Sequence, residues 1–219
     1  GQRDQEPFAF PPAVTEVFRR YVRLRYKLLP TLYSLFAAQE ERGEAILAPL
    51  NLHFDDAALD RIADQFMVGP FLLQAPFLEE KAKTRTVILP GTAPWIDAST
   101  GETVPAGEHV AKNGRLSTPL YLRAGAILAM QPGTPTQAAS TVDLRRVQLH
   151  LVVPEGWDGE SETEIVADDG LTFAYRRGER SRLRARIAAA DGHVALVTEE
   201  TAEGYGHFEL SVVIHGPVK

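Results

Sequence analysis

The stretch Val147-Gln148-Leu149-His150-Leu151-Val152 decides the fold of this sequence, because apolar and polar residues alternate along it. Successive side chains of a β-strand point to opposite faces of a sheet, so the alternation predicts a strand with one buried and one exposed face. A similar alternation returns at residues 171–175, 183–187, 193–197 and 208–214. The last third of the chain is therefore predicted to be all β.

Shorter apolar runs occupy the middle of the chain, at residues 71–73, 85–89, 120–123 and 126–130. Gly and Pro residues bound them, which is typical of short strands. Residues 131–140 are rich in Pro, Thr, Gln and Ala and show neither period, which predicts a linker. We expect a separate antiparallel β-sandwich on each side of it. The expected core residues are Trp95 and Phe77 in the first, and Leu149, Phe173, Val197 and Phe208 in the second.

A long amphipathic helix is predicted at residues 12–42, where apolar residues recur at steps of three and four. It starts at Pro12 and ends before Gly43. Pro30 removes the backbone hydrogen bond to Tyr26, so we expect a kink there.

Two more elements are predicted before residue 66. Residues 45–50 indicate a buried strand, and residues 57–65 a short helix that Asp55 or Asp56 caps. Parallel strands normally lie in a sheet that helices cover on both faces. One strand with two helices cannot make such a sheet by itself. Residues 1–65 are therefore interpreted as the end of a repeating β/α architecture.

Short strings along nearly the whole chain resemble glycoside hydrolase family 31, of the α-glucosidase type, in that family's order and approximate spacing. They are Glu6-Pro7-Phe8, LRYKLLPTLY at 24–33, residues 45–54, DQFMVGP at 64–70, APFL at 75–78, VILPG at 87–91, WID at 95–97, Thr100-Gly101, PLYLRAGAI at 119–127, and Asp168-Asp169-Gly170 with Tyr175 and Gly178. One position departs from the family: Ala48 stands before Pro49, where an arginine is common.

The resemblance implies a mainly β fold with an α/β N-terminal piece. Residues 1–65 would be the last elements of a (β/α)8 catalytic barrel, 66–137 the proximal β-sandwich domain and 138–219 the distal one. It also implies that the parent protein is a retaining glycoside hydrolase acting on α-glycosidic bonds of oligosaccharides. Retaining hydrolysis needs two carboxyl groups about 5 Å apart, and in the family both are aspartates upstream of this segment. The segment would be structural and inactive alone. The alternative is a non-catalytic carbohydrate-binding or assembly module from a truncated or split gene.

The carboxylates within the chain favour structural roles, so no catalytic or cofactor-binding residue and no cofactor is expected. Asp55 and Asp56 open a helix, Glu79 and Glu80 lie in a charged turn, and Asp64 is expected to form hydrogen bonds at the barrel end. Asp168-Asp169-Gly170 is typical of an exposed hairpin turn, with a positive φ at Gly170. Gly125 is expected at a tight bend between two strands.

The remaining candidates also favour structural roles. Trp95 and Trp157 are interpreted as packing residues in preference to sugar platforms. Arg182, Arg184 and Arg186 alternate with apolar residues, as on the exposed face of a strand. The six histidines, at positions 53, 109, 150, 193, 207 and 215, are scattered in the sequence, and none forms the close pair with a carboxylate expected of a zinc site. No metal is therefore predicted.

The composition restricts partners and location. The net charge of −6 argues against nucleic acid, and no apolar run reaches the roughly 20 residues that cross a bilayer. The absence of cysteine excludes disulfides and is compatible with a reducing compartment, which favours the cytoplasm. The expected partners are the oligosaccharide substrate and the upstream barrel. Because the helix at 12–42 would expose its apolar face, self-association through it, or poor order in its first residues, is expected.

Overall fold

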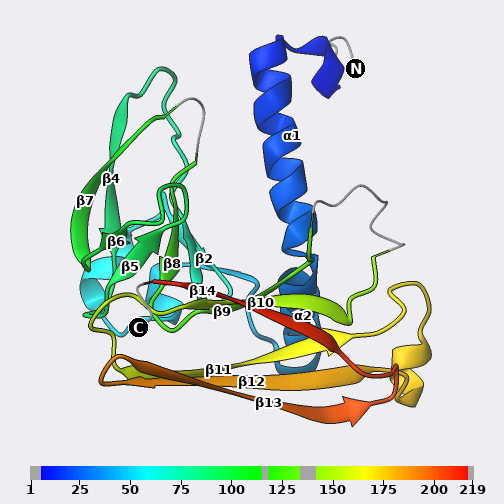
Figure 1. The fold of residues 1–219 in the computed structure, drawn as a ribbon. Coiled ribbons are helices and arrows are strands. Elements are labelled where there is room, and N and C mark those ends of the chain that lie inside the picture. Colours follow the sequence, from blue (N-terminus) through cyan, green and yellow to red (C-terminus); the bar gives the residue numbers. More distant parts are fainter. Residues whose placement is uncertain (1–5, 115–117, 134–141, 217–219) are drawn as a thin grey trace.

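A computed structural model describes residues 6–114, 118–133 and 142–216. Two helices are followed by two β-sandwiches (Figure 1). This confirms a mainly β fold with an α/β N-terminal piece, in which two helices precede a short strand at Leu47–Ala48. The helices are α1 (Pro12–Lys27) and α2 (Leu29–Arg42), with the short 3-10 helices η1 (Pro7–Ala9), η2 (Leu50–Leu52), η3 (Ala57–Arg61) and η5 (Ala174–Arg177). No helix among the described residues is long and apolar enough to span a membrane.

The predicted kink is a break between two helices. Leu28 separates α1 from α2, and Pro30 lies in the first turn of α2, where a missing backbone N–H costs little. Gly43 ends α2 in the left-handed conformation at φ 72°, as predicted. The next predicted helix is shorter and tighter than expected, since η3 is a 3-10 helix capped by Asp56.

The first sandwich packs a six-stranded sheet, in the order β1-β2-β3-β8-β5-β6, against the two-stranded sheet β4-β7. Its strands are β1 (Leu47–Ala48), β2 (Phe66–Val68), β3 (Leu72–Gln74), β4 (Thr84–Leu89), β5 (Trp95–Asp97), β6 (Thr103–Val104), β7 (Gly107–Lys112) and β8 (Leu120–Arg123). Trp95 is fully buried in this core, as predicted, whereas Phe77 is half-buried and lies outside it. The strand expected at 45–50 is reduced to β1, which pairs antiparallel with β2. It therefore joins the sandwich across the boundary predicted at residue 65.

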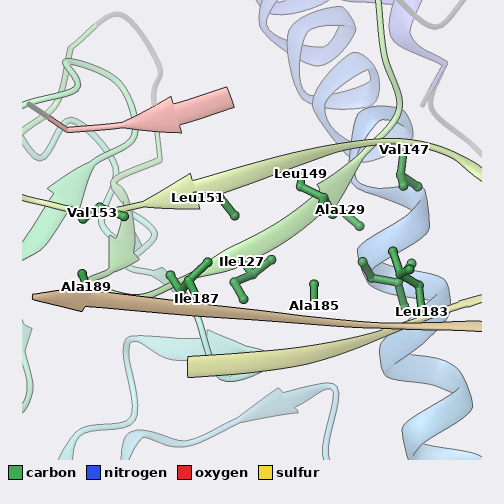
Figure 2. Packing of buried hydrophobic residues seen from close by; sticks show 11 residues of the cluster. Ile127, Ala129, Val147, Leu149, Leu151, Val153, Leu183, Ala185, Ile187 and Ala189 are labelled. Carbon is green, nitrogen blue, oxygen red and sulfur yellow. The ribbon is translucent and has the colours of Figure 1, made fainter. Parts of the chain in front are cut away.

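The second sandwich packs the sheet β14-β10-β9 on the sheet β11-β12-β13. Its strands are β9 (Ile127–Met130), β10 (Arg146–Val152), β11 (Gly159–Ala167), β12 (Ser181–Ala190), β13 (His193–Glu203) and β14 (Glu209–His215). The pairing of β10 with β14 is parallel, so this sandwich is not purely antiparallel as predicted. Figure 2 shows apolar side chains of β9 and β10 facing those of β12. Leu149 is fully buried there, and Phe208 packs at its margin.

Three details of the second unit differ from the predictions. Residues 171–175 form no strand, because residues 168–180 connect β11 to β12 and contain η5. Phe173 lies in this connection and is 68% exposed under the guanidinium of Arg176. Val197 is 62% exposed, because it lies opposite Arg186 on the outer face of β13.

Strand β9 links the two predicted halves. It precedes the expected linker at 131–140, part of which lies outside the described residues, and pairs antiparallel with β10 beyond it. The prediction that no sheet would extend across this linker is therefore wrong. The chain changes from one sandwich to the other at Gly125, whose φ is 81°, between β8 and β9. That bend matches the prediction for Gly125.

Candidate functional site

The carboxylates weighed as catalytic candidates make local structural contacts. Asp56 accepts a hydrogen bond from the Ala58 N–H at 2.9 Å and so caps η3. Glu80 is exposed, 3.8 Å from the ammonium group of Lys81. Asp64 accepts from Arg85 at 2.8 Å, and Arg85 also donates to the Asp64 carbonyl at 2.9 Å. Asp64 thus forms the hydrogen bonds expected of it, at the start of the first sandwich.

The most extensive polar cluster joins α2 to the connection between β11 and β12. At its centre Asp168 is 3% exposed, although the sequence predicted an exposed turn. Asp168 Oδ1 accepts from the Tyr33 hydroxyl at 2.5 Å and from the Gly170 N–H at 2.9 Å. Gly170 has the predicted positive φ, 63°. The turn is present, but its first carboxylate points inward to α2.

Arg180 connects this carboxylate to the acidic end of α2. Its side chain is 10% exposed, and Nη1 donates to Glu41 at 2.5 Å while Nη2 lies 3.5 Å from Glu40. Its Nε faces Asp168 Oδ2 at 3.5 Å, and within the described part of the chain neither atom has a hydrogen-bond partner. Buried charges are stabilising only when they are paired. Helix α2 and the second sandwich therefore depend on each other for charge compensation.

The ionisation of the cluster follows from these contacts. Burial, followed by the hydrogen bond to Asp168, raises the pKa of Tyr33 well above its ordinary value. A hydrogen bond from Arg182 lowers the pKa of Glu41. The tyrosine therefore stays protonated as a donor, and the glutamate stays charged over the neutral pH range.

Uncharged hydrogen bonds extend the same junction along α2. Ser34 Oγ accepts from the Val166 N–H at 3.0 Å and donates to the Pro30 carbonyl at 2.7 Å. Thr31 Oγ1 donates to the Ala129 carbonyl at 2.7 Å. A cavity of about 400 Å³ lies beside these residues, between α2, β9, β11 and the β2–β3 turn. Its apolar lining includes Leu35 and Phe71, and its charged lining includes Arg42 and Glu164.

The tryptophans and the arginine row occupy the predicted structural positions. Trp95 is fully buried, and its indole N–H donates to the Pro90 carbonyl at 3.1 Å, so it offers no face to a sugar. Trp157 is half-buried against the core of the second sandwich. Arg182 and Arg186 lie on the outer face of β12 and pair with Glu164 and Glu162 at 2.8 and 2.7 Å.

The prediction that no histidine closely pairs with a carboxylate is wrong for His207. Its Nδ1 lies 2.7 Å from Glu200, which raises the pKa of His207. A separate pair brings His150 Nδ1 within 2.8 Å of His215 Nε2, on the neighbouring strands β10 and β14. Burial, and then the neighbouring His215, lowers the pKa of His150 to about 4. His150 and His215 are 65 positions apart, and His207 lies beyond the end of the strand that carries Glu200. No local sequence motif predicts either contact.

An apolar surface is exposed on η1 and α1, and Figure 1 shows α1 projecting away from both sandwiches. We call Phe8, Phe10, Val14 and Phe18 the α1 surface; they are 40–83% exposed. No residue of α1 is buried. Several large exposed apolar side chains at nearby positions are typical of a contact site.

Comparisons with known families match the chain in two consecutive parts. Residues 1–35 match the family described as the glycosyl hydrolases family 31 TIM-barrel domain. Residues 43–128 match the glycosyl hydrolase family 31 C-terminal domain. The α1 surface therefore lies in the segment that resembles a barrel.

Two named relatives match 98% and 80% of this chain. Alpha-glucosidase 2 of Bacillus thermoamyloliquefaciens is 30% identical over 217 residues, 98% of this chain and 27% of that protein. An alpha-xylosidase of Saccharolobus solfataricus is 34% identical over 177 residues, 80% of this chain and 23% of that protein. The chain thus spans about a quarter of the length of these relatives.

Solved structures share the fold. The GH31 alpha-xylosidase of Xanthomonas citri matches with a TM-score of 0.80 and 26% identity, over 98% of this chain and 23% of that one. The GH31 dextranase of Flavobacterium johnsoniae has a TM-score of 0.86 at 24% identity, over 98% of this chain and 27% of that one.

Proposed function

This chain belongs to glycosyl hydrolase family 31, and we propose that it serves as the structural C-terminal part of a retaining, α-glucosidase-type enzyme that acts on α-glycosidic bonds of oligosaccharides. The observation that carries this proposal is the order of the two family matches, a barrel segment at 1–35 and a C-terminal domain at 43–128. The relatives named alpha-glucosidase and alpha-xylosidase support the substrate class.

Both catalytic aspartates are assigned in this proposal to barrel elements other than residues 1–219. The contacts of the carboxylates support it. Asp56 caps a helix, Asp64 is bound by Arg85, and Asp168 faces Tyr33 and Arg180. A nucleophile and a general acid must instead face a substrate about 5 Å from each other.

The proposed role of the chain is to cover the barrel and to hold α2 at a fixed angle to the sandwiches. The α1 surface supplies the apolar contact with the barrel. The cluster of Tyr33, Asp168 and Arg180 supplies the rigid attachment behind it. Three domains are proposed, a barrel end, a proximal and a distal sandwich, with β1 and β9 as the strands that cross the boundaries.

A domain exchange tests the proposal. The segment of the Bacillus alpha-glucosidase 2 that corresponds to residues 1–219 is deleted, or replaced by residues 1–219, and each protein is assayed with maltose and a chromogenic α-glucoside. We expect no turnover from the 219-residue chain alone or from the deletion, and turnover from the chimera. Glucose release by the purified 219-residue chain would contradict the assignment of the carboxylates. A folded but inactive chimera would contradict the structural role.

A further inference from the structure

Three metal-ligating side chains meet at one end of the second sandwich. Glu200 and Glu203 belong to β13, and His207 lies in the connection from β13 to β14. Each offers one ligand atom, and all three atoms lie within 4.8 Å of one another. This cluster adjoins the ion cluster around Asp168, since Glu203 pairs with Ser181 and the Gly204 N–H donates to the Arg180 carbonyl at 3.2 Å. It shares no side chain with that cluster, and the proposed function leaves it unexplained.

The distances suit a small divalent cation. Zinc holds nitrogen and oxygen ligands at about 2.1 Å, so the ligand atoms of a tetrahedral site lie about 3.4 Å apart. In the metal-free arrangement His207 Nδ1 is 2.7 Å from Glu200 Oε2 and 3.9 Å from Glu203 Oε1. His207 and Glu203 are exposed and Glu200 is half-buried, and shifts of well under 1 Å in these side chains bring both distances to the tetrahedral value.

The charges of the cluster also favour a cation. Among the described residues, His207 is the sole cationic group within 4 Å of either Glu200 or Glu203. In the metal-free arrangement Nδ1 carries the proton of its hydrogen bond to Glu200, and it has a lone pair for a cation only once that proton leaves. A divalent ion neutralises both carboxylates and accepts that lone pair, which a proton on His207 does only in part.

The backbone around the cluster is fixed by contacts outside it. Tyr205 N–H donates to Ser181 Oγ at 2.9 Å, and Ser181 Oγ donates to the Gly206 carbonyl at 2.6 Å. Arg145, in the turn before β10, donates to the Tyr205 carbonyl at 3.1 Å. The Phe208 N–H donates to Glu200 Oε1 at 2.8 Å, which leaves Oε2 directed at His207. Such outer contacts orient a ligand before the metal arrives.

We propose that Glu200, Glu203 and His207 bind a zinc ion, with water as the fourth ligand. The ion joins the end of β13, in one sheet, to the connection that leads into β14, in the other. Its binding therefore stabilises the second sandwich, whatever reaction the rest of the protein carries out.

Calorimetric titration of the untagged, chelator-treated 219-residue chain with zinc chloride tests the site. We expect one saturable site per chain, a rise in melting temperature with zinc, and reversal by EDTA. His207→Ala and Glu200→Gln should each weaken binding at least tenfold. Glutamine keeps the size of the half-buried Glu200 side chain and the acceptor for the Phe208 N–H, and His207 is 75% exposed, so circular dichroism should remain unchanged.

Two matched controls make the result decisive. His193→Ala removes an exposed histidine from β13, the strand that carries Glu200 and Glu203. His215→Gln removes the contact between His150 and His215. Neither variant should change zinc affinity. A shift of the His207 Nδ1 resonance on zinc addition would support ligation by that atom. Absence of saturable binding, binding unaffected by His207→Ala, or loss of binding with His215→Gln would overturn the proposal.

Discussion

Asp168 is the residue whose structural role differs most from its sequence context. Asp-Asp-Gly is a turn motif, and Asp169 behaves accordingly by accepting from the Thr172 N–H and hydroxyl at 3.0 and 2.6 Å. Asp168 instead is buried against Tyr33, 135 positions earlier. No local pattern reports a contact at that separation. The pairing of His207 with Glu200 is likewise not predicted by a local pattern, because it depends on how the chain turns from β13 toward β14.

Replacing Asp168 by Asn should destabilise the chain by about 2–4 kcal/mol, because Arg180 loses the carboxylate on its buried side. Asn retains an oxygen that accepts from Tyr33 and Gly170. The change in the free energy of unfolding therefore reports the loss of the negative charge alone. Urea unfolding monitored by tryptophan fluorescence measures it. Glu80→Gln, at an exposed ion pair, is the control and should stay within about 0.5 kcal/mol.

A double-mutant cycle sharpens this prediction. Asp168→Asn with Arg180→Met removes both charges of the pair, so the double variant should lose less stability than the sum of the single variants. Additive losses would show that Asp168 and Arg180 are not coupled.

At the scale of elements, the sequence predicts those features that depend on local chemistry. Pro30 breaks the long helix and Gly43 ends it, because a missing N–H and a left-handed backbone act within one turn. Residues 171–175 alternate like a strand, yet the hydrogen bonds of Asp169 and the stacking of Arg176 on Phe173 hold them in a connection. Alternation predicts a strand only where a neighbouring strand is available.

The bend at Gly125 gives the second prediction. Gly125 has φ 81°, and a Cβ there would lie 2.6 Å from the indole of Trp157. Gly125→Ala should therefore cost about 2–4 kcal/mol, from the left-handed backbone and the displaced tryptophan together. Gly101→Ala separates the two causes, since Gly101 has φ 77° and a Cβ there would meet no atom within 4 Å. We expect a loss of about 1–2 kcal/mol there by the same urea measurement. Equal losses at both positions would contradict a packing role for Trp157.

At the scale of the whole molecule, the order of the family-like strings along the chain predicts the architecture better than hydrophobic periodicity does. The family resemblance depends on strings spread over the chain, and the family matches fall at 1–35 and 43–128. Periodicity could not reveal that β14 runs parallel to β10, or that β9 crosses the expected linker. Which strands pair depends on how the two sheets pack in three dimensions, and the composition of residues 131–140 carries no information about that packing.

The α1 surface gives the last prediction. Phe8, Phe10, Val14 and Phe18 are exposed on a helix that projects from the sandwiches (Figure 1), so the isolated chain should self-associate through them. Sedimentation velocity over a tenfold concentration range should show a concentration-dependent rise in mass. Lysines at Val14 and Phe18 place like charges on both copies and should restore the monomer. Val110→Lys, at an even more exposed apolar position on β7, should leave the association unchanged. If the wild-type chain were monomeric at every concentration, the α1 surface would need no partner. The proposal that it covers a barrel would then lose its physical basis.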